Sequence, residues 1–418
     1  MFSCICWNIY DCFKRNNRKK TNLAQFLDIT NMRKVFYLVL SLVIASCTSN
    51  NELQEKLAFI DVTEEYPEKK IELTDIAGVS YLHLNSKTDD YLYKGSIDYV
   101  TENNIIVIDR SQNSVLFFSK EGNPKSHFNR RGQGPEEYSD AASLMYDEAN
   151  DEVFVSPDFS NHIMVYSSLG EFKRKINLPQ VNVNGQMALF DDVSILVYDN
   201  TKLWQSTMQS NAPEVEQTID SVFFLISKLD GTVLDYISLP NENIDLSYKN
   251  SVFTSQVNYG RVRKSADGLL LYNPESDTVF HYSKEKHLTP YMHKKPILSK
   301  NLMTVMDICM DAGKYQFIAV YPYRETGKSP TPKYYMRNKA TGELFRQKIT
   351  LSDFEGKELY INPRLFNYYE HAYHFELDFA ELEEAYYKNK LSGKLKELVA
   401  SLLENEESNN VFVFADFN

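Results

Sequence analysis

A pair of short apolar runs separated by a polar turn recurs five times between residues 105 and 342, and in most copies the second run leads into a glycine. The paired runs are 105–109 with 115–122, 152–155 with 163–170, 195–198 with 222–231, 269–272 with 278–283, and 317–321 with 334–342. The runs are rich in β-branched and aromatic residues, and Gly, Pro, Asn and Asp gather between them, which predicts strands joined by turns.

This repeat restricts the fold more than any other feature. The unit returns every ~50–60 residues, slightly more than the ~40–50 typical of propeller blades. A single blade cannot bury both of its faces, so blades must stack side by side around a ring. Five units plus one assembled from the two ends of the chain predict an all-β, six-bladed β-propeller. The alternative, a two-sheet sandwich, would not produce the recurrent strand–turn–strand–glycine unit.

The C-terminal part departs from the strand pattern. Residues 378–387 begin with an Asp-x-x-Glu start that resembles a capping box, and residues 394–403 have the apolar spacing of a helix. A polar break at 405–410 precedes the apolar run 411–417. We therefore predict a short helical insertion, followed by a last strand that closes the ring by pairing with a strand from the N-terminal segment.

Residues 32–47 have the layout of a bacterial lipoprotein signal. Two cations at 33–34 precede an apolar run, and small residues at 45–46 precede Cys47. The run is shorter than the roughly 20 residues that span a bilayer, and its flanks match a cleaved signal. The alternative is a short buried helix with an incidental cysteine. The expected organisation is a leader at 1–31 that is an artefact of the gene model, a signal peptide at 32–46, a tether at 47–56 lipidated at Cys47, and a propeller at 57–418.

Charge and cysteine content limit the partners and the chemistry. The formal net charge is −12, and residues 1–46 contribute seven Lys or Arg and two Asp, a net of +5, which leaves −17 for the rest. Such an acidic body should repel nucleic acid and anionic lipid surfaces. Three of the five cysteines lie in the expected leader and Cys47 is the expected lipidation site, so only Cys309 remains and no intramolecular disulfide is expected. We expect Cys309 to be a small buried apolar residue.

Four features together resemble a known family. They are the signal that ends at Cys47, the segment 131–138 (Arg-Gly-Gln-Gly-Pro-Glu-Glu-Tyr), the segment 276–280 (Ser-Asp-Thr-Val-Phe), and the segment 390–398 before a terminal strand. From Cys47 onward the chain is similar to the six-bladed β-propeller lipoproteins with NHL-like repeats of Gram-negative gut bacteria. That family often has Gly where this chain has Glu136. The resemblance implies a fold and an outer-membrane, periplasmic or surface-facing location, but no reaction.

The loop 129–138 is the first candidate for a binding site. Its two glycines permit close backbone approach, Pro135 stiffens the turn, and Arg130, Arg131, Gln133 and Tyr138 offer polar groups for a carboxylate or a sugar hydroxyl. The alternative is a loop that only links two blades, with Arg131 paired to a neighbouring glutamate.

Arginine and aromatic residues just outside strands form two further candidates. They are Arg261 and Arg263 after Tyr259, and Tyr323 and Arg324 after Tyr321. Such residues can line a channel mouth and stack on sugar or peptide groups, although they occur equally often in solvated turns. Trp204 lies in an irregular stretch, 200–217, that could be a lid or a simple loop.

The sequence gives little support for catalysis. His371 and His374 are three apart and could share a helical face, but neither a HExxH nor a CxxC motif accompanies them. A nucleophile elbow is also absent, so we expect no metal or other cofactor. We predict a lipid-anchored envelope protein that binds a glycan, a peptide or a partner protein. The alternative is a lyase or hydrolase with its site in the central channel, which a convergent set of His or carboxylate side chains there would favour.

Overall fold

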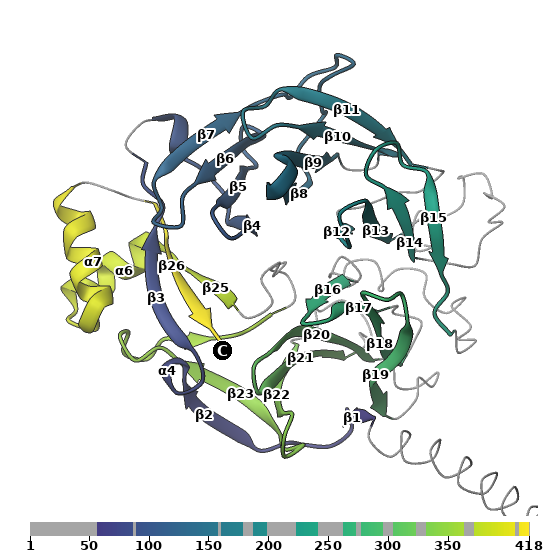
Figure 1. Ribbon diagram of the computed structural model, residues 1–418. Helices are drawn as coiled ribbons and strands as arrows, with labels where there is room; N and C mark the ends of the chain where they lie inside the picture. The colour runs from purple at the N-terminus through teal and green to yellow at the C-terminus, as the bar shows by residue number, and fades with distance from the viewer. Residues whose placement is uncertain are drawn as a thin grey trace, which may run out of the picture. The chain divides into compact units, whose positions relative to one another are not determined.

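The computed structural model describes residues 57–86, 89–157, 160–178, 187–198, 223–240, 262–272, 277–295, 304–322, 332–362, 372–405 and 409–417. Within the compact unit that begins at Ala58, six β-sheets form the blades of a propeller ring (Figure 1). The predicted all-β, six-bladed fold is therefore confirmed. The proposed leader, signal and tether lie outside the described residues.

Blades 1 to 3 each have four antiparallel strands that follow chain order, with the first strand innermost (Figure 1). Blade 1 consists of β4 (Ile97–Val100), β5 (Ile105–Asp109), β6 (Ser114–Phe118) and β7 (Pro124–Phe128). Blade 2 consists of β8 (Ser143–Asp147), β9 (Glu152–Ser156), β10 (His162–Tyr166) and β11 (Phe172–Asn177). Blade 3 consists of β12 (Met187–Leu189), β13 (Ser194–Tyr198), β14 (Phe223–Ser227) and β15 (Val233–Ile237).

Blades 4 and 5 repeat this arrangement and carry additional strands. Blade 4 consists of β16 (Val262–Ser265), β17 (Gly268–Tyr272), β18 (Thr278–Ser283) and β19 (Leu288–Lys295), with β1 (Ala58–Asp61) at its outer edge. Blade 5 consists of β20 (Thr304–Ala312), β21 (Tyr315–Pro322), β22 (Lys333–Asn338) and β23 (Leu344–Thr350), with β2 (Glu68–Glu72) and the short β24 (Glu358–Leu359) paired to β23. The five predicted units correspond to the second and third strands of blades 1 to 5.

The middle strands read as continuous apolar runs because neighbouring blades cover both of their faces. In β5, the four residues from Ile105 to Ile108 are all 0% exposed. The outer strands β7 and β11 instead alternate between covered and exposed positions, as expected for strands with one face in water. The repeat is therefore visible in the middle strands and faint in the outer ones.

Glycine occupies the turn after the third strand of blades 1 to 3 for a steric reason. Gly122, Gly170 and Gly231 all have φ near +80°, which disfavours residues with a Cβ atom. Each also lies against the end of the preceding blade's outer strand. A Cβ on Gly122 would lie 2.2 Å from the carbonyl oxygen of His83, and one on Gly170 would lie 2.4 Å from Cβ of Phe128. The glycine turn is thus a contact point between consecutive blades.

Blade 6 is assembled from both ends of the described chain, as predicted. It contains β25 (Ala372–Leu377), β26 (Val411–Asp416) and β3 (Gly78–His83). The strand β26 lies in the middle and pairs antiparallel with both neighbours, with Val413 opposite Phe375 on one side and Tyr81 on the other. The last strand therefore closes the ring onto the N-terminal segment.

The N-terminal segment also adds one strand each to blades 4 and 5, which the repeat does not predict. Before it reaches β3, it adds β1 to β19 and β2 to β23, both in parallel orientation. Only Ile60 and Ile71 are buried among their residues, so neither strand has an apolar pattern of its own. These additions protect the outer edges of blades 4 and 5 from pairing with other chains.

The predicted helical insertion is present between β25 and β26. It consists of α6 (Phe379–Tyr387) and α7 (Gly393–Glu404), which lie outside the ring next to blade 6 (Figure 1). Asp378 caps α6, since its side chain accepts a hydrogen bond from the backbone N–H of Glu381 at 3.0 Å. The short α4 (Leu73–Ile76) precedes β3. In the described part of the chain, no helix has both the length and the apolar character needed to cross a membrane.

The contact between blade 6 and blade 1 contains a buried histidine. His374 in β25 is 4% exposed and lies among the rings of Tyr373, Phe412 and Phe414. Burial lowers the pKa of His374 to about 4, and a backbone hydrogen bond to Ile97 offsets only part of this effect. The imidazole is therefore neutral in the folded protein at neutral pH.

We expect acid to destabilise the ring through His374. Below the unfolded pKa of about 6.5 the unfolded chain binds a proton that the folded chain does not, so this contribution to stability is lost as the pH falls from about 6.5 to 4. The loss should reach about 3 kcal/mol at pH 4. Urea unfolding of the protein and of His374→Phe at several pH values measures it. Parallel pH dependences for the two proteins would contradict the assignment.

Candidate functional site

The predicted loop 129–138 joins β7 of blade 1 to β8 of blade 2, and Tyr138 anchors it. The hydroxyl of Tyr138 donates to the carbonyl oxygen of Asn113 at 2.7 Å and accepts from the backbone N–H of Arg130 at 3.1 Å. Its ring is 0% exposed and packs edge-on against Tyr166. Burial raises the pKa of Tyr138 to about 12, so the hydroxyl remains a donor at all physiological pH values.

Backbone hydrogen bonds fix the rest of the loop. The N–H of Gly132 donates to the carbonyl oxygen of Tyr138 at 2.9 Å, and the N–H of Gly134 donates to the carboxylate of Glu137 at 2.8 Å. A Cβ on Gly132 would lie 1.8 Å from the same carboxylate, so a larger residue at this position would displace the exposed Glu137 side chain. The loop therefore has one well-defined backbone path.

The predicted polar side chains of this loop divide into two groups. Tyr138 is buried, and Arg130 reaches across to blade 2, where its Nε donates to the carbonyl oxygen of Gly170 at 2.7 Å. Arg131 and Gln133 are exposed. Among the described residues, Arg131 makes no ion pair with Glu136 or Glu137, the pairing that a purely structural loop would use. The loop thus presents two donors to solvent from a backbone that is held by hydrogen bonds.

The second candidate cluster is only partly described. Arg263 lies in β16, is 5% exposed and forms an ion pair with Asp307 of β20 at 3.4 Å. This contact joins the innermost strands of blades 4 and 5, so the guanidinium has a structural partner. Arg261, Tyr323, Arg324, Trp204 and Cys47 lie outside the described residues.

Within the segment 276–280, the described Asp277 has a structural role. Asp277 forms an ion pair with Lys294 of β19, and both side chains are 2% exposed. The backbone N–H of Lys294 also donates to the carbonyl oxygen of Asp277 at 2.8 Å. This buried pair joins the start of β18 to the end of β19 in blade 4.

The described residues give no indication of a metal centre or an active thiol. They contain no group of three or more His, Cys, Asp or Glu side chains able to hold a metal ion. His374 lies in a strand and not on a helix, and His371 is outside the described residues. Cys309 is fully buried, as predicted, and burial raises the pKa of its thiol.

A pocket that the sequence did not predict lies where blades 2, 3 and 4 meet. Its volume is about 240 Å³, and its walls come from turns at one end of the strands. The lining residues are Asp147, Leu189, Phe190, Asp191, Asp192, Lys228, Lys264, Ser265, Gly268, Leu269 and Lys284. Asp147 ends β8, whereas the loop 129–138 precedes β8, so the pocket and the loop lie at opposite ends of this strand. We call this cavity the inter-blade pocket.

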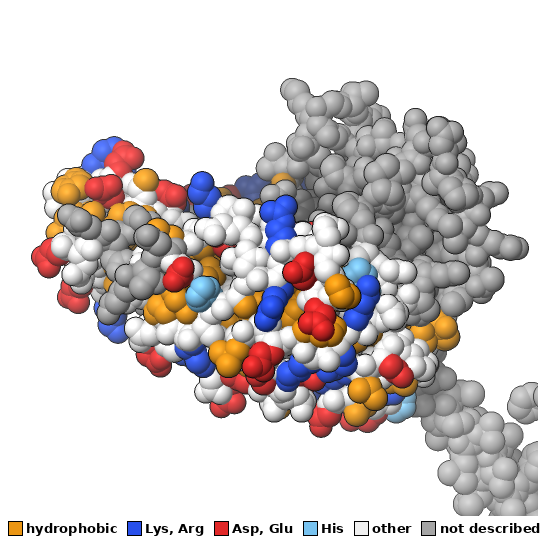
Figure 2. All heavy atoms as spheres, turned by 90° about the horizontal axis from the view of Figure 1, so that it is seen from above, with side chains coloured by type: hydrophobic (Ala, Val, Ile, Leu, Met, Phe, Trp, Pro, Cys, Tyr) orange, Lys and Arg blue, Asp and Glu red, His pale blue; other side chains and the backbone are white. Residues whose placement is uncertain are grey.

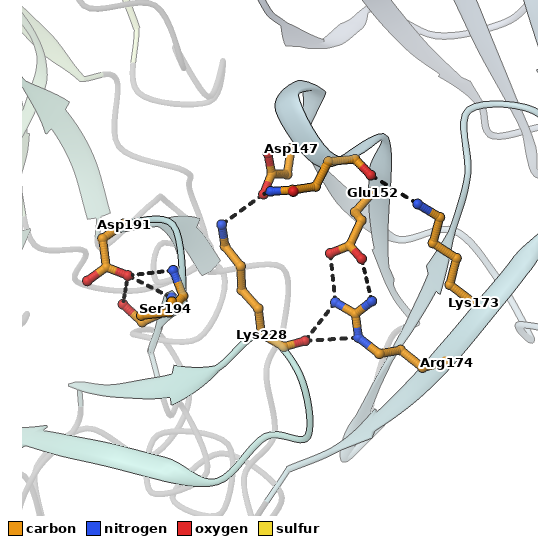
Figure 3. A network of polar contacts seen from close by, with 9 residues as sticks. Asp147, Glu152, Lys173, Arg174, Asp191, Ser194 and Lys228 are labelled. Carbon is orange, nitrogen blue, oxygen red and sulfur yellow. Dashed lines mark hydrogen bonds and ion pairs between the residues drawn. The ribbon is translucent and has the colours of Figure 1, made fainter.

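A network of polar contacts supports one wall of the inter-blade pocket (Figure 3). The ammonium of Lys228 donates to the carboxylate of Asp147 at 2.8 Å, and the two side chains are 10% and 9% exposed. The carbonyl oxygen of Lys228 accepts from Arg174 at 2.8 and 3.0 Å, and Arg174 pairs with both carboxylate oxygens of Glu152. The position of Lys228 is therefore fixed at both ends.

Two carboxylates of the pocket are held in the ionised form. Burial alone would raise the pKa of Asp147, but hydrogen bonds from Lys228 and Asn150 outweigh it and lower the pKa. Burial alone would also raise the pKa of Asp191. Hydrogen bonds from Ser194 and from the backbone N–H of Val193 outweigh this effect and lower the pKa. An ionised, hydrogen-bonded carboxylate suits binding of a cation or a donor better than general acid catalysis.

A recurring sequence signal could have revealed the inter-blade pocket. The acidic pairs Asp147-Glu148 and Asp191-Asp192 both lie at the C-terminal end of the innermost strand of their blade. Acidic pairs at equivalent places in consecutive repeats must lie near each other in a ring. The buried lysine partner, Lys228, carries no such signal, because it lies in an ordinary strand–turn junction.

On the face seen in Figure 2, acidic and basic side chains are interspersed over the described residues. An extended basic patch of the kind that binds nucleic acid does not appear on that part of the surface. This agrees with the acidic composition.

The family model described as Domain of unknown function (DUF4934) matches residues 57–416. None of the curated proteins matches the chain. The crystal structure of a protein from Bacteroides fragilis that is described as exported is similar, with a TM-score of 0.58, 15% identity, and coverage of 84% of this chain and 99% of that chain. At this identity the likeness shows the fold alone.

Two further structures are more distant. A member of the DUF4221 family from Bacteroides vulgatus has a TM-score of 0.46 and 12% identity over 82% of this chain and 97% of that chain. Virginiamycin B lyase from Staphylococcus aureus has a TM-score of 0.30 and 13% identity over 64% of this chain and 97% of that chain. Neither likeness is close enough to support an argument about function, including a lyase activity.

Proposed function

The chain belongs to the family described as Domain of unknown function (DUF4934), and we propose that it is a lipid-anchored propeller of the cell envelope that binds a glycan, a peptide or a partner protein without catalysing a reaction. The sequence around Cys47 supports the anchor, because small residues precede a cysteine after an apolar run. The description of the Bacteroides fragilis structure as exported agrees with an envelope location.

The observation that carries the binding role is the loop 129–138. Tyr138 and the backbone hydrogen bonds hold this loop in one conformation, while Arg131 and Gln133 are exposed. A rigid loop loses little conformational entropy when a ligand binds. An arginine on such a loop can form bidentate, charge-assisted hydrogen bonds with a carboxylate. A glutamine can form hydrogen bonds with a sugar hydroxyl or a peptide group.

Two experiments test the proposal. Fractionation of cells should place the natural protein with membranes and the Cys47→Ala variant in the soluble fraction, because a multiply acylated cysteine anchors firmly and the bare chain does not. Retention of Cys47→Ala on membranes after a high-salt wash would argue against lipidation. The soluble variant is then applied to glycan and peptide arrays, where we expect binding of at least one class and no chemical change in the bound compound.

A further inference from the structure

The inter-blade pocket has features of a second binding site that is independent of the loop 129–138. Three aspartates and three lysines line it, so its ionisable groups sum to zero charge. Its volume of about 240 Å³ corresponds to roughly eight water molecules at ~30 Å³ each. It is thus smaller than the ~300–1,000 Å³ of pockets for drug-sized ligands, and it fits a small molecule.

The acidic wall on blade 3 is fixed before any ligand arrives. One carboxylate oxygen of Asp191 accepts three hydrogen bonds, from the hydroxyl of Ser194 at 2.6 Å and from the backbone N–H groups of Ser194 and Val193 at 2.7 and 2.9 Å. Within the described residues, the second oxygen accepts none. Asp191 therefore presents a fixed, ionised acceptor, and the exposed Asp192 lies next to it.

The basic wall comes from blade 4. Lys264 is the next-to-last residue of β16 and Lys284 follows β18, and both line the same cavity as Asp191. Ser265, the last residue of β16, is 8% exposed, and its hydroxyl has no hydrogen-bond partner among the described residues. A buried hydroxyl without a partner is unfavourable, and a polar ligand or water in the pocket would supply one.

Charges of both signs decide which ligand fits. The buried Lys228–Asp147 pair joins blade 3 to blade 2, and Asp191 and Asp147 lie on either side of its ammonium in Figure 3. A neutral ligand would cover ionised groups without compensating them, which is costly. A ligand with one positive and one negative group compensates the negative charge of one wall and the positive charge of the other. The partly exposed Leu189 and Phe190 and the buried Leu269 supply an apolar surface between them.

We propose that the inter-blade pocket binds a small zwitterion, a free amino acid or dipeptide, with the ligand ammonium at Asp191 and Asp192 and its carboxylate at Lys284. The side chain of the ligand contacts Leu189, Phe190 and Leu269. The proposal does not depend on the function of the loop 129–138, because the two sites lie at opposite ends of β8.

Isothermal titration calorimetry of the full-length Cys47→Ala protein tests this assignment. The probes are the twenty free amino acids and simple dipeptides, followed by N-acetylated and amidated forms of any that bind. We expect at least one free compound to bind and each blocked form to bind at least tenfold more weakly. Asp191→Asn and Lys284→Gln should each weaken binding by about tenfold or more.

Control variants separate a binding defect from a folding defect. Lys284 is exposed, so Lys284→Gln should not shift the melting temperature. Asp191→Asn weakens the hydrogen bonds from Ser194 and Val193 and should lower the melting temperature slightly, so its affinity is measured well below its unfolding transition. Lys394→Gln removes an exposed lysine from α7, outside the pocket, and should leave the affinity unchanged. Three results would overturn the proposal: no free amino acid or dipeptide binds, blocked forms bind equally well, or Asp191→Asn and Lys284→Gln bind like the parent.

Discussion

Truncation of the chain after Asn410 is expected to unfold the entire propeller. The deletion removes β26, the middle strand of blade 6, together with its hydrogen bonds to both β25 and β3. It also removes Val411, Phe412, Val413 and Phe417, which are at most 1% exposed. Burial of each such side chain contributes about 1.5–3 kcal/mol, or about 6–12 kcal/mol together, which is comparable with the about 5–15 kcal/mol that stabilises a typical domain.

Thermal unfolding followed by circular dichroism measures the effect of this truncation. We expect loss of the cooperative transition, because an open ring exposes the unpaired edges of β25 and β3. A peptide of residues 409–418 added in trans should restore the transition, whereas the same peptide with Val413→Asp should not, since Val413 is 0% exposed. A truncated protein with an unchanged melting temperature would show that β26 does not close the ring.

Replacement of Lys294 by alanine is expected to lower the free energy of unfolding by about 3–5 kcal/mol. Lys294 and Asp277 form an ion pair with both side chains 2% exposed. Removal of one partner leaves a buried charge without compensation, and this is the usual size of the penalty. Urea denaturation at pH 7 gives the difference in the free energy of unfolding.

Two comparisons make this prediction specific. Lys333 pairs with Glu65 at the surface, where the side chains are 40% and 73% exposed, so Lys333→Ala should cost less than about 1 kcal/mol. The double variant Lys294→Met with Asp277→Leu should recover most of the stability, because apolar residues of similar volume can replace a buried pair. Equal effects of Lys294→Ala and Lys333→Ala would contradict a buried role for the pair.

The sequence predicted those parts of the fold that local pattern determines. The middle strands of five blades were visible because both faces of each are buried, which produces apolar runs such as Ile105–Ile108. The closing strand was visible for the same reason. In contrast, β1 and β2 could not be predicted, since each buries a single apolar residue and is held by the backbone of a strand more than 200 residues away.

The candidate sites likewise combine local features, which the sequence predicts, with contacts between blades, which it does not. The loop 129–138 was identified from its own residues, because glycine and proline spacing is a local signal. The buried role of Tyr138 and the bond from Arg130 to Gly170 depend on blade 2 and were not predictable. The inter-blade pocket combines turns from three blades, so its lining becomes apparent only when the ring is assembled.

The affinity of Arg131→Ala for a ligand identified on the arrays tests the proposed binding role most directly. A charge-assisted hydrogen bond contributes about 1.5–3 kcal/mol, so we predict that the affinity falls about tenfold or more. The melting temperature should not change, because Arg131 is exposed, and Lys394→Ala, which removes an exposed cation from α7, should retain full affinity. A lowered melting temperature with unchanged affinity would mean that the loop 129–138 is structural and that the ligand binds elsewhere.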